Sequence, residues 1–468
     1  MDTEEGKRSL IQTNSLWVIV AVVFSALIPA LSIEDWFLKV FTLSFYILLL
    51  LVFHRCYNLL NWVDPTVMFA VSYATFIGIG IIATGYFGIV MQPSVLVAII
   101  VGLASLLVGA VFLDLITSPS RRLRITRFTS IAAIYRFKEI AWAWIFFAIG
   151  IMILVFYYYS VGTIPLLAEN AETVRVTAKA GRGYLPIGGF AFVFVSTAMI
   201  TACYAKRHLL RFALYAGLPL VVGAILLLGV GYRMPAVRVL LNAFIIYSFV
   251  KRGRISKVTL LTLVLVIIIF LSLIGFYRFT GQFAQSPEQI EFAFSRAVWS
   301  IFVRYLNTLD LVMSFFPDHH PFMLGESYLI SANTVLPGAQ LHFGFWLRER
   351  LGLVFISPGP VDPTIIGEFY ANFGWSGVVV GMSALGFTLR TLFAVFTRKT
   401  SISLRRVVLM VLISTSLIGV AGSGLILVLL FDLLPVVLVF LAYSFCVKAA
   451  WFSSREGPVA TRPAPAKT

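Results

Sequence analysis

Arginines near the ends of apolar segments are the residues of this sequence whose type and position suggest chemistry. Arginine can donate two hydrogen bonds to phosphate oxygens, and it stays charged when partly removed from water. Drawn from several segments, such a set could converge on one ligand that carries two phosphates, although any single arginine at a membrane surface can equally extend toward lipid headgroups. The arginines concerned are Arg175, Arg182, Arg233, Arg238, Arg278, Arg296, Arg304, Arg348 and Arg350.

Groups that could accept a proton follow in the same part of the chain. His319 and His320 stand in the proline-bracketed sequence FFPDHHPF, and a neutral imidazole can take the proton of a hydroxyl group near pH 7. The adjacent Asp318 would allow a metal ion instead. Two neighbouring imidazoles rarely converge on one ion, and the sequence has no paired Cys/His spacing, so we expect no metal. Glu368 could orient a ligand, pair with an arginine or cap a helix.

The segment 288–316 has the periodicity of an amphipathic helix. Its residues Arg296, Arg304, Asn307 and Asp310 fall within about 120° of arc on a helical projection. We expect this helix to lie along the outer surface, or to dip into the protein, with its polar stripe facing a site; a merely solvated face is the alternative. A further membrane crossing is disfavoured, because the polar stripe would then face lipid.

The chain that carries these residues is both apolar and basic. Of its 468 residues, 60% are hydrophobic and 12% are charged, whereas soluble domains have about 25% charged residues. A soluble enzyme is therefore excluded. The formal net charge of +16 is not gathered in the dense basic clusters of a nucleic-acid binder, and the three isolated cysteines form neither a disulfide framework nor a zinc motif. We expect an all-α polytopic membrane protein.

Twelve apolar runs approach the roughly 20 residues that a bilayer crossing requires. Basic residues fall between alternate runs, which by the positive-inside rule places both termini in the cytoplasm. Lys7 and Arg8 precede the first run and no small-residue cleavage site follows it, so we expect a retained span. The runs are 16–33, 36–54, 66–84, 93–116, 140–160, 186–204, 209–231, 236–250, 258–276, 374–396, 407–427 and 430–448.

These spans predict one integral membrane domain over residues 1–468 with a large, partly helical outer loop. Two outer loops are enlarged, 161–185 and 277–373, and the Pro/Ala-rich cytoplasmic tail, 449–468, should be disordered. Because basic residues are depleted on the outer side, the arginines found there carry more information than the cytoplasmic ones. Arg238 lies a few residues inside its span, where an ionisable group is a candidate functional residue.

The stretch 362–386, DPTIIGEFYANFGWSGVVVGMSALG, resembles the bacterial Wzy-type oligosaccharide repeat-unit polymerases, also called O-antigen polymerases. In that family a large outer loop re-enters the membrane through the pattern GE-(F/L)-Y-x-N-F-G-x-x-G, and the preceding MLGESYLISANTVLPG is similar to the family's upstream loop segment. The glycines would allow a sharp turn into a helix and close helix packing. The matching residues are Gly367, Glu368, Tyr370, Asn372, Phe373, Gly374 and Gly377.

The resemblance implies a glycosyltransferase of the bacterial plasma (inner) membrane that uses no nucleotide, metal or other cofactor. It would polymerise polyprenyl-diphosphate-linked oligosaccharide repeat units on the outer leaflet, with one lipid-linked glycan as donor and another as acceptor. The acceptor hydroxyl would attack the anomeric carbon as the lipid diphosphate leaves. Besides these substrates and the bilayer, a chain-length regulator and a flippase of the same pathway could be partners; no nucleic acid is expected.

The resemblance also implies roles for individual residues. Diphosphate binding is expected of Arg175, Arg182, Arg233, Arg238 and Arg278. Glycan binding is expected of Arg296, Arg304, Asn307, Asp310 and Tyr370, and catalysis of His319, His320 and Glu368. Two other functions stay open, an O-antigen ligase that transfers the same donor to a different lipid and a lipid-linked oligosaccharide flippase. A scaffolding membrane protein would give the outer arginines no purpose.

Overall fold

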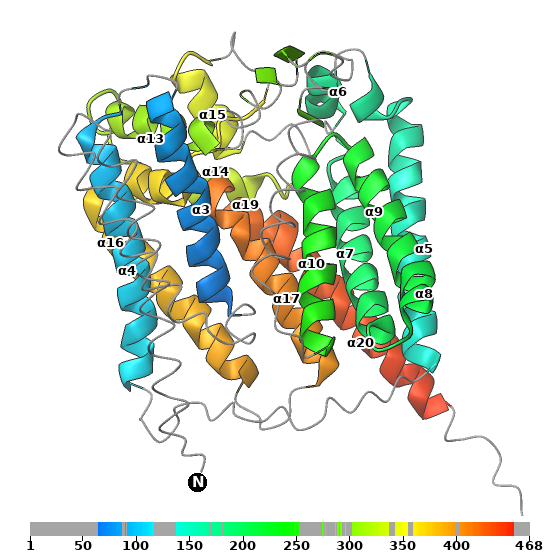
Figure 1. Ribbon diagram of the computed structural model, residues 1–468. Coiled ribbons are helices and arrows are strands. Elements are labelled where there is room, and N and C mark those ends of the chain that lie inside the picture. The colour runs from blue at the N-terminus through cyan, green and yellow to red at the C-terminus, as the bar shows by residue number, and fades with distance from the viewer. Residues whose placement is uncertain are drawn as a thin grey trace, which may run out of the picture.

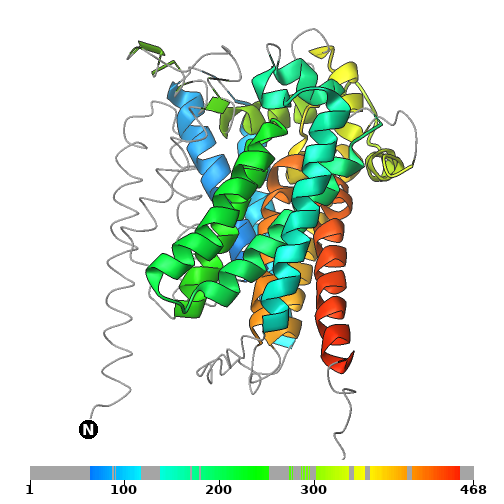
Figure 2. The ribbon, with the colours of Figure 1, turned by 90° about the vertical axis from the view of Figure 1, so that its right-hand side faces the viewer.

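The computed structural model describes residues 64–86, 89, 91–116, 137–168, 171–178, 181–251, 302–336, 342–353, 359–397 and 403–453, with a few single positions between 274 and 295. Every regular element within these residues is a helix, so the expected all-α class is confirmed for them. Figures 1 and 2 show long helices side by side, with shorter helices gathered at one end. That end carries the segments predicted to lie outside the membrane, and we call it the outer end.

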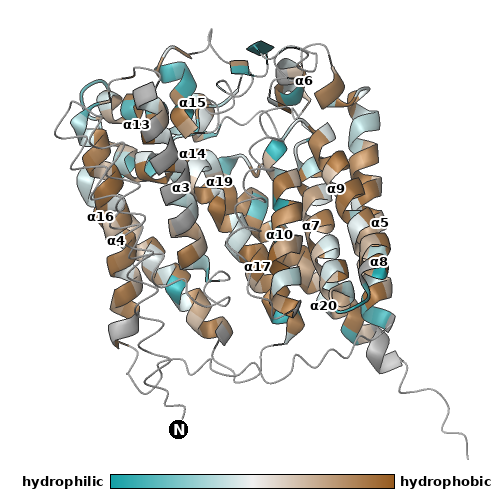
Figure 3. Cartoon of the chain, viewed as in Figure 1, coloured by the Kyte–Doolittle hydropathy of each residue, from teal (hydrophilic) through white to brown (hydrophobic). Residues whose placement is uncertain are grey.

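Eight helical stretches among the described residues are long and apolar enough to cross a membrane. Figure 3 shows them mostly brown, with teal residues toward their ends. They are α4 (Pro93–Ile116), α5 (Phe137–Val161), α7 (Tyr184–Tyr204), α8 (Leu209–Phe212) with η4 (Ala213–Gly217) and α9 (Leu218–Gly229), α10 (Arg233–Lys251), α16 (Thr364–Thr397), α17 (Leu404–Ile418) with α18 (Val420–Ser423), and α19 (Leu425–Val428) with η7 (Leu429–Leu433) and α20 (Leu434–Ser453).

The eight stretches coincide with predicted runs, and α3 (Pro65–Tyr86) coincides with the run 66–84. The runs 16–33 and 36–54 and most of 258–276 lie outside the described residues, so twelve crossings remain a prediction. Two helices begin earlier than predicted, α16 at Thr364 and α19 at Leu425. The first turns of α16 are buried and include the polar residues Glu368 and Asn372, so a hydropathy average misses them. The predicted run 407–427 instead extends past the turn at Gly424 into α19, because the residues on both sides of that turn are mostly apolar.

Glycines let two of the membrane helices approach closely. A Cβ on Gly109 of α4 would stand 1.9 Å from the carbonyl oxygen of Ser383 in α16. Gly386 of α16 faces α4 in the same way, with its Cβ position 2.0 Å from the carbonyl oxygen of Leu106. Such close backbone approach supplies the van der Waals contact that holds helices together in lipid.

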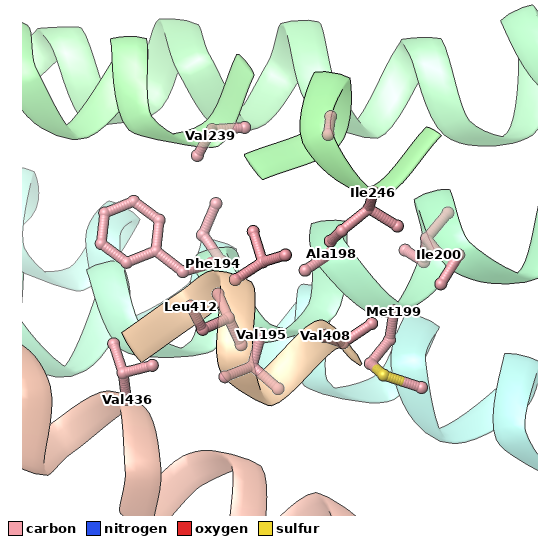
Figure 4. Packing of buried hydrophobic residues seen from close by; sticks show 14 of the residues in the cluster. Phe194, Val195, Ala198, Met199, Ile200, Val239, Ile246, Val408, Leu412 and Val436 are labelled. Atoms are coloured by element: carbon pink, nitrogen blue, oxygen red, sulfur yellow. The ribbon is translucent and has the colours of Figure 1, made fainter. Parts of the chain in front are cut away.

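Two groups of buried apolar side chains form the interior. One joins α3, α4 and α16 with the outer helix α13 (Arg304–Phe315), and the other joins α5, α7, α10, α17 and α20. Figure 4 shows part of the second group, with Phe194 and Val195 of α7, Val239 of α10, Leu412 of α17 and Val436 of α20. The helices at the two sides of the molecule thus have different cores, and α3, α16 and α17 contribute to both.

Short helices cover the outer end: α6 (Ala171–Thr177), α13, α14 (Glu326–Asn333) and α15 (Phe343–Arg350) (Figure 1). The helix α13 lies within the predicted amphipathic segment 288–316. Its Leu309 and Val312 are buried, whereas Arg304 and Asn307 are exposed, so one face of α13 packs on the membrane helices and the other does not.

At the opposite end, ion pairs join helices that are far apart in the sequence. Arg390 of α16 binds Asp64, which precedes α3, at 2.6 Å. Arg405 of α17 pairs with Glu139 of α5. These contacts tie the ends of four helices together on the side away from the outer helices.

Candidate functional site

Charged side chains from three segments lie around the hydroxyl group of Tyr305 in α13. Its neighbour Arg304 forms an ion pair, at 2.6 Å, with Asp362 from the segment that leads into α16. Burial raises the pKa of the Tyr305 hydroxyl, the Asp362 carboxylate raises it further, and the Arg304 and Arg233 guanidinium groups lower it. Arg233, the first residue of α10, therefore lies close to the same hydroxyl as Arg304. Two of the predicted arginines are brought together here.

The turn before α10 links this group to a third arginine. The Nη1 of Arg233 stands 2.5 Å from the position that a Cβ would take at Gly275. One residue earlier is Tyr232. The guanidinium carbon of Arg175 lies over its ring, 4.7 Å from the ring centroid. The preceding Gly231 has a φ of +88° and also lies against the Arg175 side chain. Arg175 of α6 and Arg233 of α10 thus meet at one turn.

Arg182 lies nearby, exposed in the turn that precedes α7. The guanidinium group of Arg182 is close enough to the hydroxyl of Tyr157 in α5 to interact with it electrostatically, and Tyr157 is also close to Tyr232. Three residues of the predicted diphosphate set, Arg175, Arg182 and Arg233, are therefore placed around the same pair of tyrosines at the outer end.

Glu368 is buried beneath the outer helices and binds the turn between two spans. Its Oε2 accepts a hydrogen bond from the backbone N–H of Leu425, at 2.6 Å. That turn is the single residue Gly424, whose φ of 91° suits glycine and whose Cβ position would lie 2.8 Å from the Glu368 carboxylate. Tyr328 of α14 lies close enough for its hydroxyl to interact with the Glu368 charge. Glu368 thus caps α19 and still faces an outer helix.

The remaining motif residues shape a kink in α16. Gly374 has φ 61° and ψ −146°, a conformation that glycine adopts far more readily than other residues, and it divides α16 into an outer part and a longer inner part. Asn372 ties the loop before α14 to this kink. Its Nδ2 donates to the hydroxyl of Ser327 at 2.6 Å, and its Oδ1 accepts from the N–H of Gly325 at 2.9 Å.

Arg238 lies five residues further along α10 than Arg233, with four protein acceptors around its guanidinium group. Its Nη1 pairs with Asp432 of η7, and its Nη2 donates to the hydroxyl of Ser416 and to the carbonyl oxygen of Leu412, the latter at 3.1 Å. Its Nε donates to the hydroxyl of Thr415 at 3.3 Å. The Arg238 side chain is 10% exposed. Its donors are therefore directed into the protein.

The two histidines lie between α13 and α14. His319 is exposed, and the Nδ1 of His320 lies 2.7 Å from the carbonyl oxygen of Pro321. The His320 ring stands edge-on to Trp346 of α15, at 5.2 Å between centroids. Nothing among the described contacts joins these imidazoles to Arg233. Within the described residues, no three His, Cys, Asp or Glu side chains are grouped as a metal site would require.

The rest of the predicted glycan set is spread along α13 and the kink. Asn307 is exposed, whereas Asp310 accepts a hydrogen bond from the N–H of Gln92 at 3.4 Å, and burial raises its pKa. The ring of Tyr370 stands edge-on to Phe322, at 5.8 Å. Two predicted residues, Arg278 and Arg296, lie outside the described residues.

Three residues with a clear place in the site were not selected from the sequence. Asp432 could have been found as the one acidic residue within the run 430–448, because a charge inside a span requires a partner. Asp362 could have been found as the acidic residue that opens the stretch 362–386. Tyr305 had no distinguishing signal, since the chain has 18 tyrosines.

Fold and site together define an all-helical membrane protein with several crossings and a group of arginines, tyrosines and a carboxylate at its outer end. The sequence matches the family model described as "Putative O-antigen polymerase" over residues 61–431. The chain therefore belongs to the O-antigen polymerase family, as the resemblance in 362–386 predicted. Membership indicates a membrane polymerase of lipid-linked repeat units. No curated protein and no solved structure matches the chain.

Proposed function

We propose that the protein is a glycosyltransferase that polymerises polyprenyl-diphosphate-linked oligosaccharide repeat units on the outer leaflet of the bacterial inner membrane, with both termini in the cytoplasm. The observation that carries the proposal is the gathering of Arg175, Arg233 and Arg304 at the outer end. These arginines come from three separate segments, lie around Tyr232 and Tyr305, and bring positive charge together there. The family model supports a polymerase over a ligase or a flippase.

In the proposed reaction a hydroxyl oxygen of the acceptor glycan forms a bond to the anomeric carbon of the donor. The bond from that carbon to the diphosphate oxygen breaks, and the electron pair leaves with the lipid diphosphate. The proton of the hydroxyl passes to a base of the protein. Since negative charge grows on the leaving oxygen, positively charged donors already in place stabilise the transition state more than the ground state.

Geometry suggests a division of these roles among the predicted residues. Arg233 and Arg304 are best placed to bind the diphosphate, and Arg175 and Arg182 could bind its outer oxygens or the first sugars. Glu368 is our preferred base, because its carboxylate lies against Gly424, two residues from the Gly422 that packs on the Tyr305 ring, whereas Asp362 is paired with Arg304.

The other predicted residues take secondary places in the proposal. His319 and His320 remain alternative bases on the rim, where His319 is exposed. Arg238 has its donors on protein acceptors, and we give it a different role in the next subsection.

The test is to incubate the purified protein with a polyprenyl-diphosphate-linked repeat unit alone, without nucleotide or added metal, and to separate the products by size on a gel. We expect a ladder of polymers. Arg233→Ala and Arg304→Ala should each lower the initial rate by about 10²–10³-fold, as removal of one transition-state donor does in other enzymes. Arg406→Ala, near the opposite end of the molecule, is the matched control and should leave the ladder intact.

Two outcomes would contradict the proposal. Intact ladders with both Arg233→Ala and Arg304→Ala would show that the diphosphate binds elsewhere. Product that forms only when a different acceptor lipid is supplied would identify a ligase.

A further inference from the structure

A hairpin of two spans carries the turn that contacts Glu368. Its first arm is α17 with α18, its second arm is α19 with η7 and α20, and Gly424 alone connects them. Beside this residue, the N–H of Leu425 donates to Glu368 at 2.6 Å. On the first arm, Gly422 lies against the ring of Tyr305, since a Cβ there would be 2.8 Å from the ring. The tip of the hairpin is therefore in contact with two groups of the candidate site.

Arg238 of α10 binds both arms of this hairpin with one guanidinium group. The first arm provides three acceptors, the carbonyl oxygen of Leu412 and the hydroxyl groups of Thr415 and Ser416. The second arm provides the carboxylate of Asp432. Because the guanidinium group is planar and its donor directions are fixed, it constrains how the two arms lie relative to each other and to α10.

The surroundings of this ion pair are apolar. The guanidinium carbon lies 4.3 Å from the centroid of the Phe194 ring. Figure 4 shows Phe194, Val195, Leu412 and Val436 grouped in this part of the interior. Hydrogen bonds are stronger in such an environment than in water, and a charge left there without its partner is costly. Neither arm can move away from Arg238 without losing a strong interaction.

The Arg238–Asp432 ion pair is close enough to the hairpin tip at Gly424 to control the position of the tip. Asp432 follows Leu425 by seven residues (432 − 425), which is about two helical turns or about 10 Å along the axis. We infer that Arg238 and Asp432 are positioning residues, which hold the hairpin at the depth where the N–H of Leu425 meets Glu368. The consequence for turnover rests on the proposed function, because Glu368 acts as the base there.

The test removes both charges at once, in the variant Arg238→Met/Asp432→Asn, because loss of one partner alone would leave a buried charge. Hydrogen exchange of the full-length protein in detergent, followed by mass spectrometry, reports the Leu425 amide. We expect this amide to exchange about tenfold faster or more. We also expect kcat to fall about tenfold or more while KM changes less than about threefold, since the arginines that bind the donor keep their places.

The matched control is Arg390→Met/Asp64→Asn, which removes an ion pair between α16 and the start of α3, at the end away from the hairpin tip. This variant should leave both the Leu425 exchange and kcat unchanged. Ser416→Ala is a milder variant that removes one acceptor of the first arm and keeps the ion pair. It should speed the Leu425 exchange several-fold, and it replaces the double variant if the latter does not fold.

Each outcome bears on the inference. Unchanged Leu425 exchange in the folded double variant, or in Ser416→Ala in its place, would overturn it. Faster exchange with an unchanged kcat would overturn the claim that the position of the tip matters for turnover. If the wild-type protein makes no polymer, while the amide exchanges faster in the double variant and not in the control, the proposed function fails and the positioning role stands.

Discussion

Glu368 combines a structural contact and a possible chemical role in one side chain. Its Oε2 accepts the hydrogen bond from Leu425, and an amide oxygen could accept the same bond without a negative charge. The structural contact depends on an acceptor oxygen, whereas proton transfer depends on the carboxylate. Substitutions at this position can therefore separate the two.

We expect Glu368→Gln to melt close to the wild-type temperature and to polymerise about 10²–10⁴-fold more slowly, because the acceptor oxygen stays and the base is lost. Glu368→Ala should be inactive and should also lose about 1–3 kcal/mol of unfolding free energy, since the N–H of Leu425 would be left without its acceptor. Thermal melting in detergent and the polymer ladder measure the two effects. A glutamine variant that polymerises at the wild-type rate would leave the histidines as the candidate bases.

Residue types at the outer end could be predicted from the sequence, but their partners could not. Arg233 and Arg238 stand in the same helix near the same end, and diphosphate binding was expected of both, although Arg238 lies a few residues inside its predicted span. In the structure, Arg233 lies near Tyr305, whereas Arg238 is bonded to Asp432, 194 positions later. That Arg238 directs its donors into the protein depends on the packing of α10 against η7 and α17, and local patterns hold no information about that packing.

The kink of α16 is the element on which the outer part of the site depends. The outer arm of α16 carries Glu368 and Asn372, and its direction relative to the inner arm is set at Gly374. A Cβ at Gly374 would lie 2.9 Å from the ring of Phe322, so both backbone conformation and space favour glycine at this position.

Gly374→Ala is therefore expected to lower the free energy of unfolding by about 1–3 kcal/mol and to reduce polymerisation, because the strained backbone tilts the arm that holds Glu368. Gly188→Ala in α7 is the matched control, since a Cβ at Gly188 meets nothing within 4 Å and its backbone is helical. That control should be neutral or more stable by about 0.4–1 kcal/mol. Equal melting temperatures for the two variants would show that the kink tolerates a side chain.

Hydropathy predicted the interiors of the spans well and their outer ends less well. The run 374–396 begins at the kink and misses the arm from Thr364, because that arm is covered by protein and includes polar residues such as Glu368 and Asn372. The run 407–427 extends past the turn into α19, because the single residue Gly424 leaves almost no polar sequence between the two spans. A segment that faces lipid must have mostly apolar residues, which a hydropathy average detects. A segment covered by other helices can include polar residues, so the same average misses it.

Along most of their length the helices present apolar residues, and hydrophilic residues gather at the two ends of the molecule (Figure 3). The positive-inside rule assigns the outer helices α13–α15 to the outer side and the turn after α7 to the cytoplasm. This orientation, and the count of twelve spans that depends in part on residues 1–63, are whole-molecule predictions that follow from the charge pattern of the sequence.

Labelling with a membrane-impermeant maleimide in spheroplasts checks the orientation, in a background where alanine replaces the three cysteines. We expect His319→Cys to be labelled in intact spheroplasts, and Lys206→Cys to be labelled only after the membrane is permeabilised, since both positions are exposed and they lie at opposite ends of the molecule. The reverse pattern would invert the topology and with it the leaflet on which the reaction is proposed.

Ion pairs between distant residues also bear on how the chain is synthesised and inserted. The early partners are inserted long before the late ones are translated. Arg238 then lies inside a span without its partner, which is costly, whereas Asp64 and Glu139 lie at helix ends. The later spans supply the missing partners, so we expect a nascent chain that stops before them to retain unmatched charges and to be degraded by membrane quality control. The pairs, 326, 266 and 194 positions apart, are Asp64–Arg390, Glu139–Arg405 and Arg238–Asp432.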